Sequence, residues 1–371
     1  MSARTLTSSE RDWLAVRAYL TEHRHDLAVD AARDYPPGAA VAGTPLLAAP
    51  AWRPPAPVPL RDISLELTAP ARPDGAAPRT LLPRRADGTR YRRYSEAMAE
   101  LAAPRVFVNR ATYRLTEADL TSWPQRLAFT AGRYFDGIDT GEAAAHEYAA
   151  VRLGLPAGGL RGRFADPCDL RRRPANLAIS VLTLRLDAAA GLASFPLHWR
   201  DPAIVGHAGG LYQVVPVGVF QPSHDAARPD GPDFSLWRCM VREFAEELAG
   251  HPEDRGPADY DSWPFARQLT LALDRGQVRV WCLGLGTDPL TYATDLLTAA
   301  VFEAGVFDAQ FGAPSGRVSA PGPRRNAEGE VLAAREFTAD VIARTVSRDP
   351  VQAAGSALLR LAWEHRDTLL G

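Results

Sequence analysis

Apolar side chains recur at helical spacing in several parts of the chain. Trp13, Val16 and Leu20 fall near one stripe, which predicts a helix over residues 8–33 that Ser8 or Ser9 can cap. The same kind of pattern predicts further helices over residues 94–101, 141–151, 235–248, 290–302 and 336–370.

Other segments have the pattern of strands. Residues 177–186 and 192–199 are apolar runs joined by a short link, which predicts a hairpin. Strands are also expected over residues 63–67, 105–115, 211–219 and 278–285. The Pro-rich stretch 35–83 is expected to run over a surface, because each proline removes a backbone donor.

The most regular helical pattern is LWRCMVREFAEELAG, residues 236–250. Its apolar members form one stripe, at relative positions 0, 3, 4, 7 and 11: Trp237, Met240, Val241, Phe244 and Leu248. The sequence therefore predicts that residues 235–248 form a helix whose apolar stripe is buried.

Three carboxylates lie off this stripe. Glu243 and Glu247 are four residues apart, hence neighbours on one helix face, and Glu246 lies beside them. A divalent cation such as Mg²⁺ would remove their mutual repulsion, because hard cations prefer oxygen ligands. The competing interpretation is an exposed face made of good helix-forming residues.

The segment Arg242-Glu243-Phe244-Ala245-Glu246-Glu247 resembles the R-E-U-x-E-E part of the Nudix hydrolase signature, where U is a bulky aliphatic residue. Upstream, Pro216-Val217-Gly218 is similar to the strand end that opens this motif. The resemblance implies an α/β fold for residues 176–371, a Nudix-like α/β/α sandwich with a mixed sheet. An α+β domain with the Pro-rich segment, of unknown function, is expected over residues 1–170, and Arg171-Arg172-Arg173 is expected to be a solvated linker.

The resemblance also implies roles for individual residues. Glu243, Glu246 and Glu247 would bind Mg²⁺ or Mn²⁺, with Glu243 and Glu247 as the catalytic residues. Arg242 would orient the carboxylates through an ion pair, and Gly218 would have a structural role. The implied activity is metal-dependent hydrolysis of a diphosphate linkage in a nucleoside diphosphate derivative or a related metabolite.

The sequence departs from the motif between Gly218 and Arg242. His224 stands where the first glutamate of the motif belongs, and the loop is about ten residues longer than in the motif. Asp225, Asp230 or Asp233 could replace the missing carboxylate. His224, Asp233 and Asp288 are candidate substrate contacts. The departures keep a second hypothesis open, a protein of Nudix-like fold that binds a nucleotide or metabolite without hydrolysing it, as a sensor or scaffold.

Composition and charge exclude other classes of function. The chain has 371 residues, a net charge of −2 and 42 basic residues, all of them arginine, so chemistry that requires lysine is excluded. Three scattered cysteines and the lack of an apolar N-terminal segment predict a reduced, cytoplasmic protein. Without a long apolar run or a basic stripe, neither a membrane nor a nucleic acid is expected as a partner. The expected partner is a small diphosphate molecule.

Overall fold

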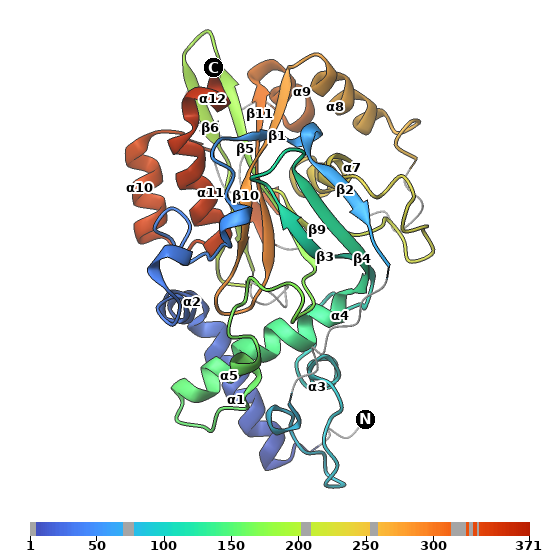
Figure 1. The fold of residues 1–371 in the computed structure, drawn as a ribbon, viewed down its shortest axis with the longest axis vertical. Coiled ribbons are helices and arrows are strands. Elements are labelled where there is room, and N and C mark those ends of the chain that lie inside the picture. The colour runs from blue at the N-terminus through green and yellow to red at the C-terminus, as the bar shows by residue number, and fades with distance from the viewer. Residues whose placement is uncertain are drawn as a thin grey trace.

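The computed structural model describes residues 5–69, 78–201, 209–252, 259–312, 324–325, 329–331 and 334–371. These residues form a mixed α/β fold with three sheets and flanking helices (Figure 1). The predicted α/β class is therefore confirmed.

The main sheet is mixed, and its strands come from both halves of the chain. Its order is β1 (Val58–Pro59), β10 (Val278–Thr287), β11 (Thr294–Glu303), β5 (Leu177–Asp187), β6 (Leu192–Phe195) and β14 (Arg335–Glu336), and β9 (Val217–Val219) also pairs with β5. β11 and β5 run parallel, whereas the other pairs are antiparallel.

The helix predicted over residues 290–302 is wrong, because this segment contains strand β11. Every residue of β11 except Glu303 is buried between β10 and β5. A strand covered on both faces is apolar all round, so its sequence has no alternation that separates it from a buried helix.

The remaining strands form two smaller sheets. One has the order β2 (Ser64–Leu67), β4 (Arg126–Arg133) and β3 (Ala111–Asp119). The other has the order β12 (Arg324–Arg325), β13 (Gly329–Val331), β7 (His198–Arg200) and β8 (Tyr212–Gln213). Pairing of β7 with β8 places His198 opposite Gln213.

Helices pack against the main sheet from two sides. In Figure 1, α10 (Ala339–Arg348) and α11 (Ala353–Glu364) lie to one side, and α7 (Leu236–Glu243) and α8 (Pro264–Asp274) to the other. The remaining helices of this half are α9 (Ala304–Phe311) and α12 (Arg366–Leu370). The helical character predicted for residues 336–370 is confirmed as α10, α11 and α12.

The N-terminal half contributes a separate group of helices. They are α1 (Ser8–Glu22), α2 (Arg24–Ala32), α3 (Tyr94–Leu101), α4 (Tyr134–Gly137), α5 (Ala143–Arg152) and α6 (Leu160–Arg163), with a π-helical turn η5 (Ile138–Glu142) and short 3₁₀ turns at Pro37–Ala39, Pro50–Trp52, Leu60–Asp62 and Arg79–Leu81. The helix expected over residues 8–33 is divided at His23, and Thr7 rather than a serine caps its first part.

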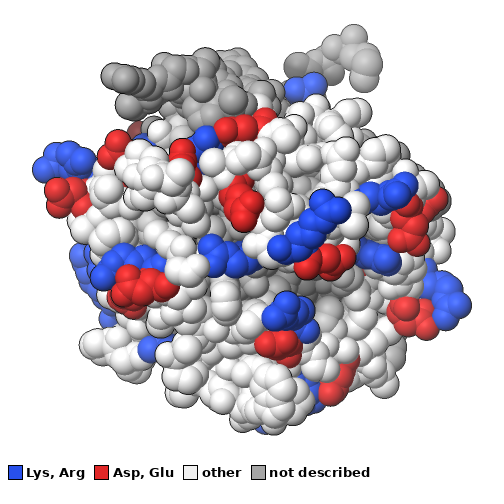
Figure 2. All heavy atoms as spheres, turned by 90° about the horizontal axis from the view of Figure 1, so that it is seen from above, with Lys and Arg blue, Asp and Glu red and all other residues white. Residues whose placement is uncertain are grey.

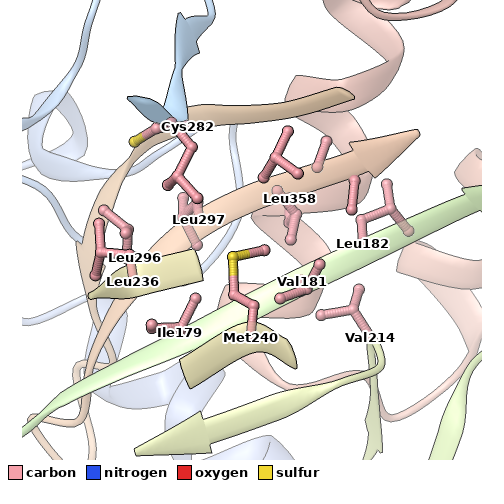
Figure 3. Close-up of a cluster of buried hydrophobic side chains, with 14 of the residues drawn as sticks. Ile179, Val181, Leu182, Val214, Leu236, Met240, Cys282, Leu296, Leu297 and Leu358 are labelled. Carbon is pink, nitrogen blue, oxygen red and sulfur yellow. The ribbon is translucent and has the colours of Figure 1, made fainter. Parts of the chain in front are cut away.

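One hydrophobic core joins the two halves of the chain. Its centre contains Met240 of α7, Val181 of β5, Leu297 of β11 and Leu358 of α11 (Figure 3). Side chains of the first 170 residues, such as Trp52, belong to the same cluster. The Pro-rich stretch therefore contributes to the core as well as to the surface, and the division at residues 170–176 stays a prediction.

The arginine run at this division is only partly solvated. Arg173 is buried and donates hydrogen bonds to Tyr292 O, at 2.8 Å, and to the hydroxyls of Thr287 and Thr294. For Arg173 the expectation of a solvated linker is therefore wrong, because its guanidinium ties residue 173 to the loop between β10 and β11. Burial lowers the pKa of Arg173 to about 10.

Over the residues that the structure describes, neither the helices nor the charges visible in Figure 2 mark a membrane-spanning segment or a charged patch. Among the described residues, no helix is long and apolar enough to cross a membrane. The face seen in Figure 2 has acidic and basic side chains interspersed rather than gathered by sign.

Candidate functional site

The glutamate-bearing segment 235–248 is helical, as the sequence predicts. Ser235 caps it by accepting a hydrogen bond from Arg238 N at 3.3 Å. Of the predicted apolar stripe, four side chains are buried and the fifth, Trp237, is half-buried: Met240, Val241, Phe244 and Leu248 are the buried ones. The stripe therefore anchors the helix on the core and leaves the glutamates at its side.

The last turn of this helix is a π-helical turn, η6 (Phe244–Leu248). Its widened hydrogen bond runs from Ala249 N to Phe244 O at 3.0 Å. Such turns carry one more residue than an α-helical turn and are frequent at functional sites. The turn contains both Glu246 and Glu247, of which Glu247 is buried and Glu246 half-buried. The α-helical spacing used in the sequence prediction does not predict this difference in burial between Glu246 and Glu247.

Gly218 of β9 makes room for the side chain of Glu243. A Cβ atom at position 218 would lie 2.0 Å from Glu243 Cδ and 2.2 Å from Oε1, a distance that non-bonded atoms do not adopt. The carboxylate of Glu243 therefore rests directly on the backbone of β9. The predicted structural role of Gly218 has a physical basis in this contact.

Glu247 contacts the same strand. Its Oε1 accepts a hydrogen bond from Val217 N at 3.2 Å, and its Oε2 lies 3.5 Å from Nδ1 of His198. Among the described residues, Oε2 and both ring nitrogens of His198 are buried without a hydrogen-bond partner. The structure thus brings the carboxylates of Glu243 and Glu247 to adjacent residues of β9, with a buried histidine beside one of them.

His198 and His207 flank the expected connection from the hairpin to the next strand, where either could contact substrate, although histidines in loops usually have no special role. The structure buries His198 completely. His207, the other histidine near this strand, lies outside the described residues. His198 and Glu247 are 49 positions apart, so their contact depends on the packing of the chain and has no local pattern.

Arg242 fastens the long loop before the helix. It forms a salt bridge to Asp233 Oδ1 at 3.1 Å, donates to Gln221 O at 2.6 Å and contacts the Tyr260 hydroxyl. Tyr260 also donates to Asp233 at 2.6 Å, and the N–H and hydroxyl of Ser223 donate to the other carboxylate oxygen. Each oxygen of Asp233 therefore has partners within the protein.

The charges in this network stabilise one another. Burial alone would raise the pKa of Asp233, but hydrogen bonds from Tyr260 and Ser223, together with Arg242, lower it. Burial would likewise lower the pKa of Arg242, and the negative groups around it, including Asp233, raise it instead. Asp233, which lies in the inserted loop between Gly218 and Arg242, is thus the carboxylate that pairs with Arg242.

The other two candidate substrate contacts lie in loops. His224 is half-buried in the loop that carries Asp233. Asp288 is buried in the loop between β10 and β11, where its Oδ1 accepts hydrogen bonds from Leu290 N and from the N–H and hydroxyl of Thr291. None of these bonds joins Asp288 to the glutamate helix.

The donor chemistry at β9 fits a hard divalent cation. In the described parts of the chain, no three side chains of His, Cys, Asp or Glu gather closely enough to hold a metal ion. Mg²⁺, however, is often held by one or two carboxylates with substrate phosphates and water as the other ligands. Glu243 and Glu247 meet that smaller requirement, and Oε2 of Glu247 has no hydrogen-bond partner among the described residues.

Comparison with known proteins adds little to this geometry. No family model matches the chain, and no curated protein matches it. Among solved structures, the chain is similar to a NUDIX hydrolase from Alicyclobacillus acidocaldarius, with 17% identity and a TM-score of 0.30 over 53% of this chain and 95% of that one. A likeness this distant assigns neither a family nor an activity to the chain.

Proposed function

We propose that the protein hydrolyses a diphosphate linkage in a nucleoside diphosphate derivative or a related metabolite, with Mg²⁺ or Mn²⁺ as cofactor. The observation that carries the proposal is the placement of Glu243 and Glu247 on adjacent residues of β9. Its second support is the sequence R-E-U-x-E-E at residues 242–247, with Gly218 at the strand end. A Nudix-like α/β/α sandwich over residues 176–371 is part of the same proposal.

Glu243 and Glu247 would hold the cation, with the half-buried Glu246 as a further ligand. When bound, the cation neutralises pyrophosphate oxygens and lowers the pKa of an attacking water. If Glu246 and Glu247 hold the cation, Glu243, which is less buried than Glu247, would instead be the general base for the attacking water.

The neighbouring residues hold these carboxylates in place. Gly218 provides the space that Glu243 fills, and Val217 N fixes one oxygen of Glu247. The salt bridge between Arg242 and Asp233 fixes the end of the inserted loop against the helix. Such positioning matters because displacement of a catalytic group by about 1 Å can cost on the order of 10² in rate.

A second function is favoured by one observation. Among the described residues no three-ligand metal cluster exists, and Asp233, the buried carboxylate of the inserted loop, is occupied by Arg242. A domain that binds a nucleotide or metabolite as a sensor or scaffold, without hydrolysis, requires neither a three-ligand metal cluster nor an available carboxylate in the inserted loop. The two functions differ in turnover and not in binding.

A panel of nucleoside diphosphate derivatives and other diphosphate metabolites tests both functions. Release of monophosphate or phosphate is measured with Mg²⁺, with Mn²⁺ and with excess chelator, and binding of each compound is measured by calorimetry. Hydrolysis that stops on chelation supports the hydrolase. Micromolar binding of a compound that is not hydrolysed with either ion would contradict the hydrolase and support the binding function.

A further inference from the structure

A pocket of about 420 Å³ lies between helix α2 of the N-terminal half and the α10–α11 pair. Figure 1 shows these helices as neighbours. The loops 43–45 and 288–291 close its other sides, and none of Glu243, Glu246 and Glu247 lines it. Its volume is in the range of small-molecule sites, and its walls come from five segments far apart in the sequence.

Arg360 of α11 provides a cationic group to this pocket. Its guanidinium is half-buried and donates to Ala42 O at 3.1 Å. No carboxylate lies within salt-bridge distance of it in the part of the chain that the structure describes. A partly desolvated guanidinium with free N–H groups matches the planar oxygens of a phosphate or carboxylate.

The α2 wall of the pocket also carries positive charge. Arg24 lines it and binds both oxygens of Glu142, at 3.0 and 3.1 Å. Glu142 is shared with Arg17, at 2.6 Å, so two guanidinium groups share one carboxylate. The triad of two guanidinium groups and one carboxylate therefore has a net positive charge, next to the pocket.

Two acidic groups near the pocket already have partners. Asp288 lines it, but two backbone N–H groups and a hydroxyl donate to its Oδ1. Asp30 of α2 pairs with Arg33, at 2.5 Å. Apolar side chains cover much of the remaining wall, among them Val29, Leu211, Leu290, Val346 and Val351.

The loops that close the pocket are conformationally strained. Ala42 and Tyr292 are the non-glycine residues with positive φ in the described chain, at 47° and 56°. Ala42 precedes the lining loop 43–45, and Tyr292 follows the lining residue Thr291. Strained backbone is retained mainly where the surrounding structure has a use for it, and it concentrates at ligand sites.

We propose that this pocket binds a small molecule that carries a phosphate or carboxylate group on an apolar body. Arg360 and the Arg17–Arg24–Glu142 triad attract the anion, and the apolar wall receives the body. The proposal is independent of the hydrolase, since Glu243, Glu246 and Glu247 do not line the pocket.

Calorimetric titration with phenyl phosphate, benzoate and neutral benzyl alcohol tests the proposal. The two anions should bind more tightly than the alcohol, and their ratio shows whether phosphate or carboxylate is preferred. Arg360→Met should weaken anion binding by roughly ten- to a hundredfold, the loss expected for a charge-assisted hydrogen bond. Arg344→Met on α10, which does not line the pocket, is the matched control and should bind as the wild type does.

A second variant covers the case in which Arg360→Met fails to fold. Val29→Glu places a carboxylate on the α2 wall and should abolish anion binding while leaving the chain's circular dichroism unchanged. The proposal is overturned if benzyl alcohol binds as tightly as the anions, or if folded Arg360→Met and Val29→Glu proteins both bind the anions like the wild type.

Discussion

The side chain of Glu243 occupies the place that a Cβ atom at Gly218 would take, since such an atom would lie 2.0 Å from Glu243 Cδ. The contact couples the strand end of the Nudix-like motif to its first helical glutamate, although the two residues are 25 positions apart. Glycine is required here by the neighbouring side chain and not by its own backbone angles. A site held in this way is sensitive to a single added methyl group.

Gly218→Ala should therefore displace Glu243. Because the atoms in the way are the end of a flexible side chain, we expect little change in the free energy of unfolding and a fall in diphosphate hydrolysis on the order of 10², as the carboxylate leaves its place. Urea denaturation and initial rates measure the two effects. Gly305→Ala is the matched control, because a Cβ atom there meets nothing within 4 Å. Equal behaviour of the two variants would show that Glu243 does not depend on the space at Gly218.

Phe244→Ala should destabilise the whole helix. Phe244 is fully buried and packs against Phe302 and Phe311. Removing its ring should cost about 3–5 kcal/mol, through lost burial and the cavity that remains. The half-exposed Leu271→Ala of α8, measured by the same denaturation, should change stability by less than about 0.5 kcal/mol. A small effect of Phe244→Ala would contradict the packing of the helix on the sheet.

Asp233→Asn should leave the buried guanidinium of Arg242 without its counter-charge. We expect a loss of about 3 kcal/mol at neutral pH, measured by denaturant unfolding. Because the folded-state pKa of Asp233 is lowered, this stabilisation is present above about pH 4 and disappears as the pH falls through the folded pKa. Asp230→Asn, at a surface pair with Arg228, is the control and should unfold like the wild type.

His146 should make the protein less stable in acid. Burial, followed by the charge of Arg17, lowers the pKa of His146 to about 3, against 6.5 in its ordinary state. Between these values the unfolded chain binds the proton and the folded chain does not, so stability falls as the pH drops from 6.5 towards 3. The slope from this group is at most about 1.4 kcal/mol per pH unit.

His146→Gln should reduce that slope, measured as the free energy of unfolding from pH 7 to pH 4. His23→Gln, at a partly exposed residue, is the comparison variant and should keep the wild-type slope. If His146→Gln has the slope of the wild type, His146 is protonated in the folded state.

Local pattern predicted the helix around Phe244 and the strands near residues 177–186 and 278–285, and the structure contains them. Burial alternates along the first residues of both strands, which is the pattern that distinguishes a strand from a helix. Residues 294–303 form a strand buried on both faces, and their uniform apolarity led to the wrong prediction of a helix. The π-helical turn at Phe244–Leu248 has no signal in the periodicity, since it differs from an α-helix by one residue.

The candidate site was predictable only where its residues are near in sequence. Glu243, Glu246 and Glu247 form a motif within one helix, and Gly218 lies at the end of a predicted strand. His198 contacts Glu247 across 49 positions, and Arg360 contacts Ala42 across 318 positions. Contacts of this range depend on the packing of the whole chain.

Turnover by the Glu247→Gln variant tests the central claim most directly. Gln keeps the shape of the side chain and removes the charge at β9, so the kcat for diphosphate hydrolysis with Mg²⁺ or Mn²⁺ should fall by a factor on the order of 10². Glu96→Gln, at a surface salt bridge with Arg85, should keep the wild-type rate. A Glu247→Gln protein that hydrolyses the substrate as fast as the wild type, or a wild type that hydrolyses no diphosphate with either ion, would contradict the account.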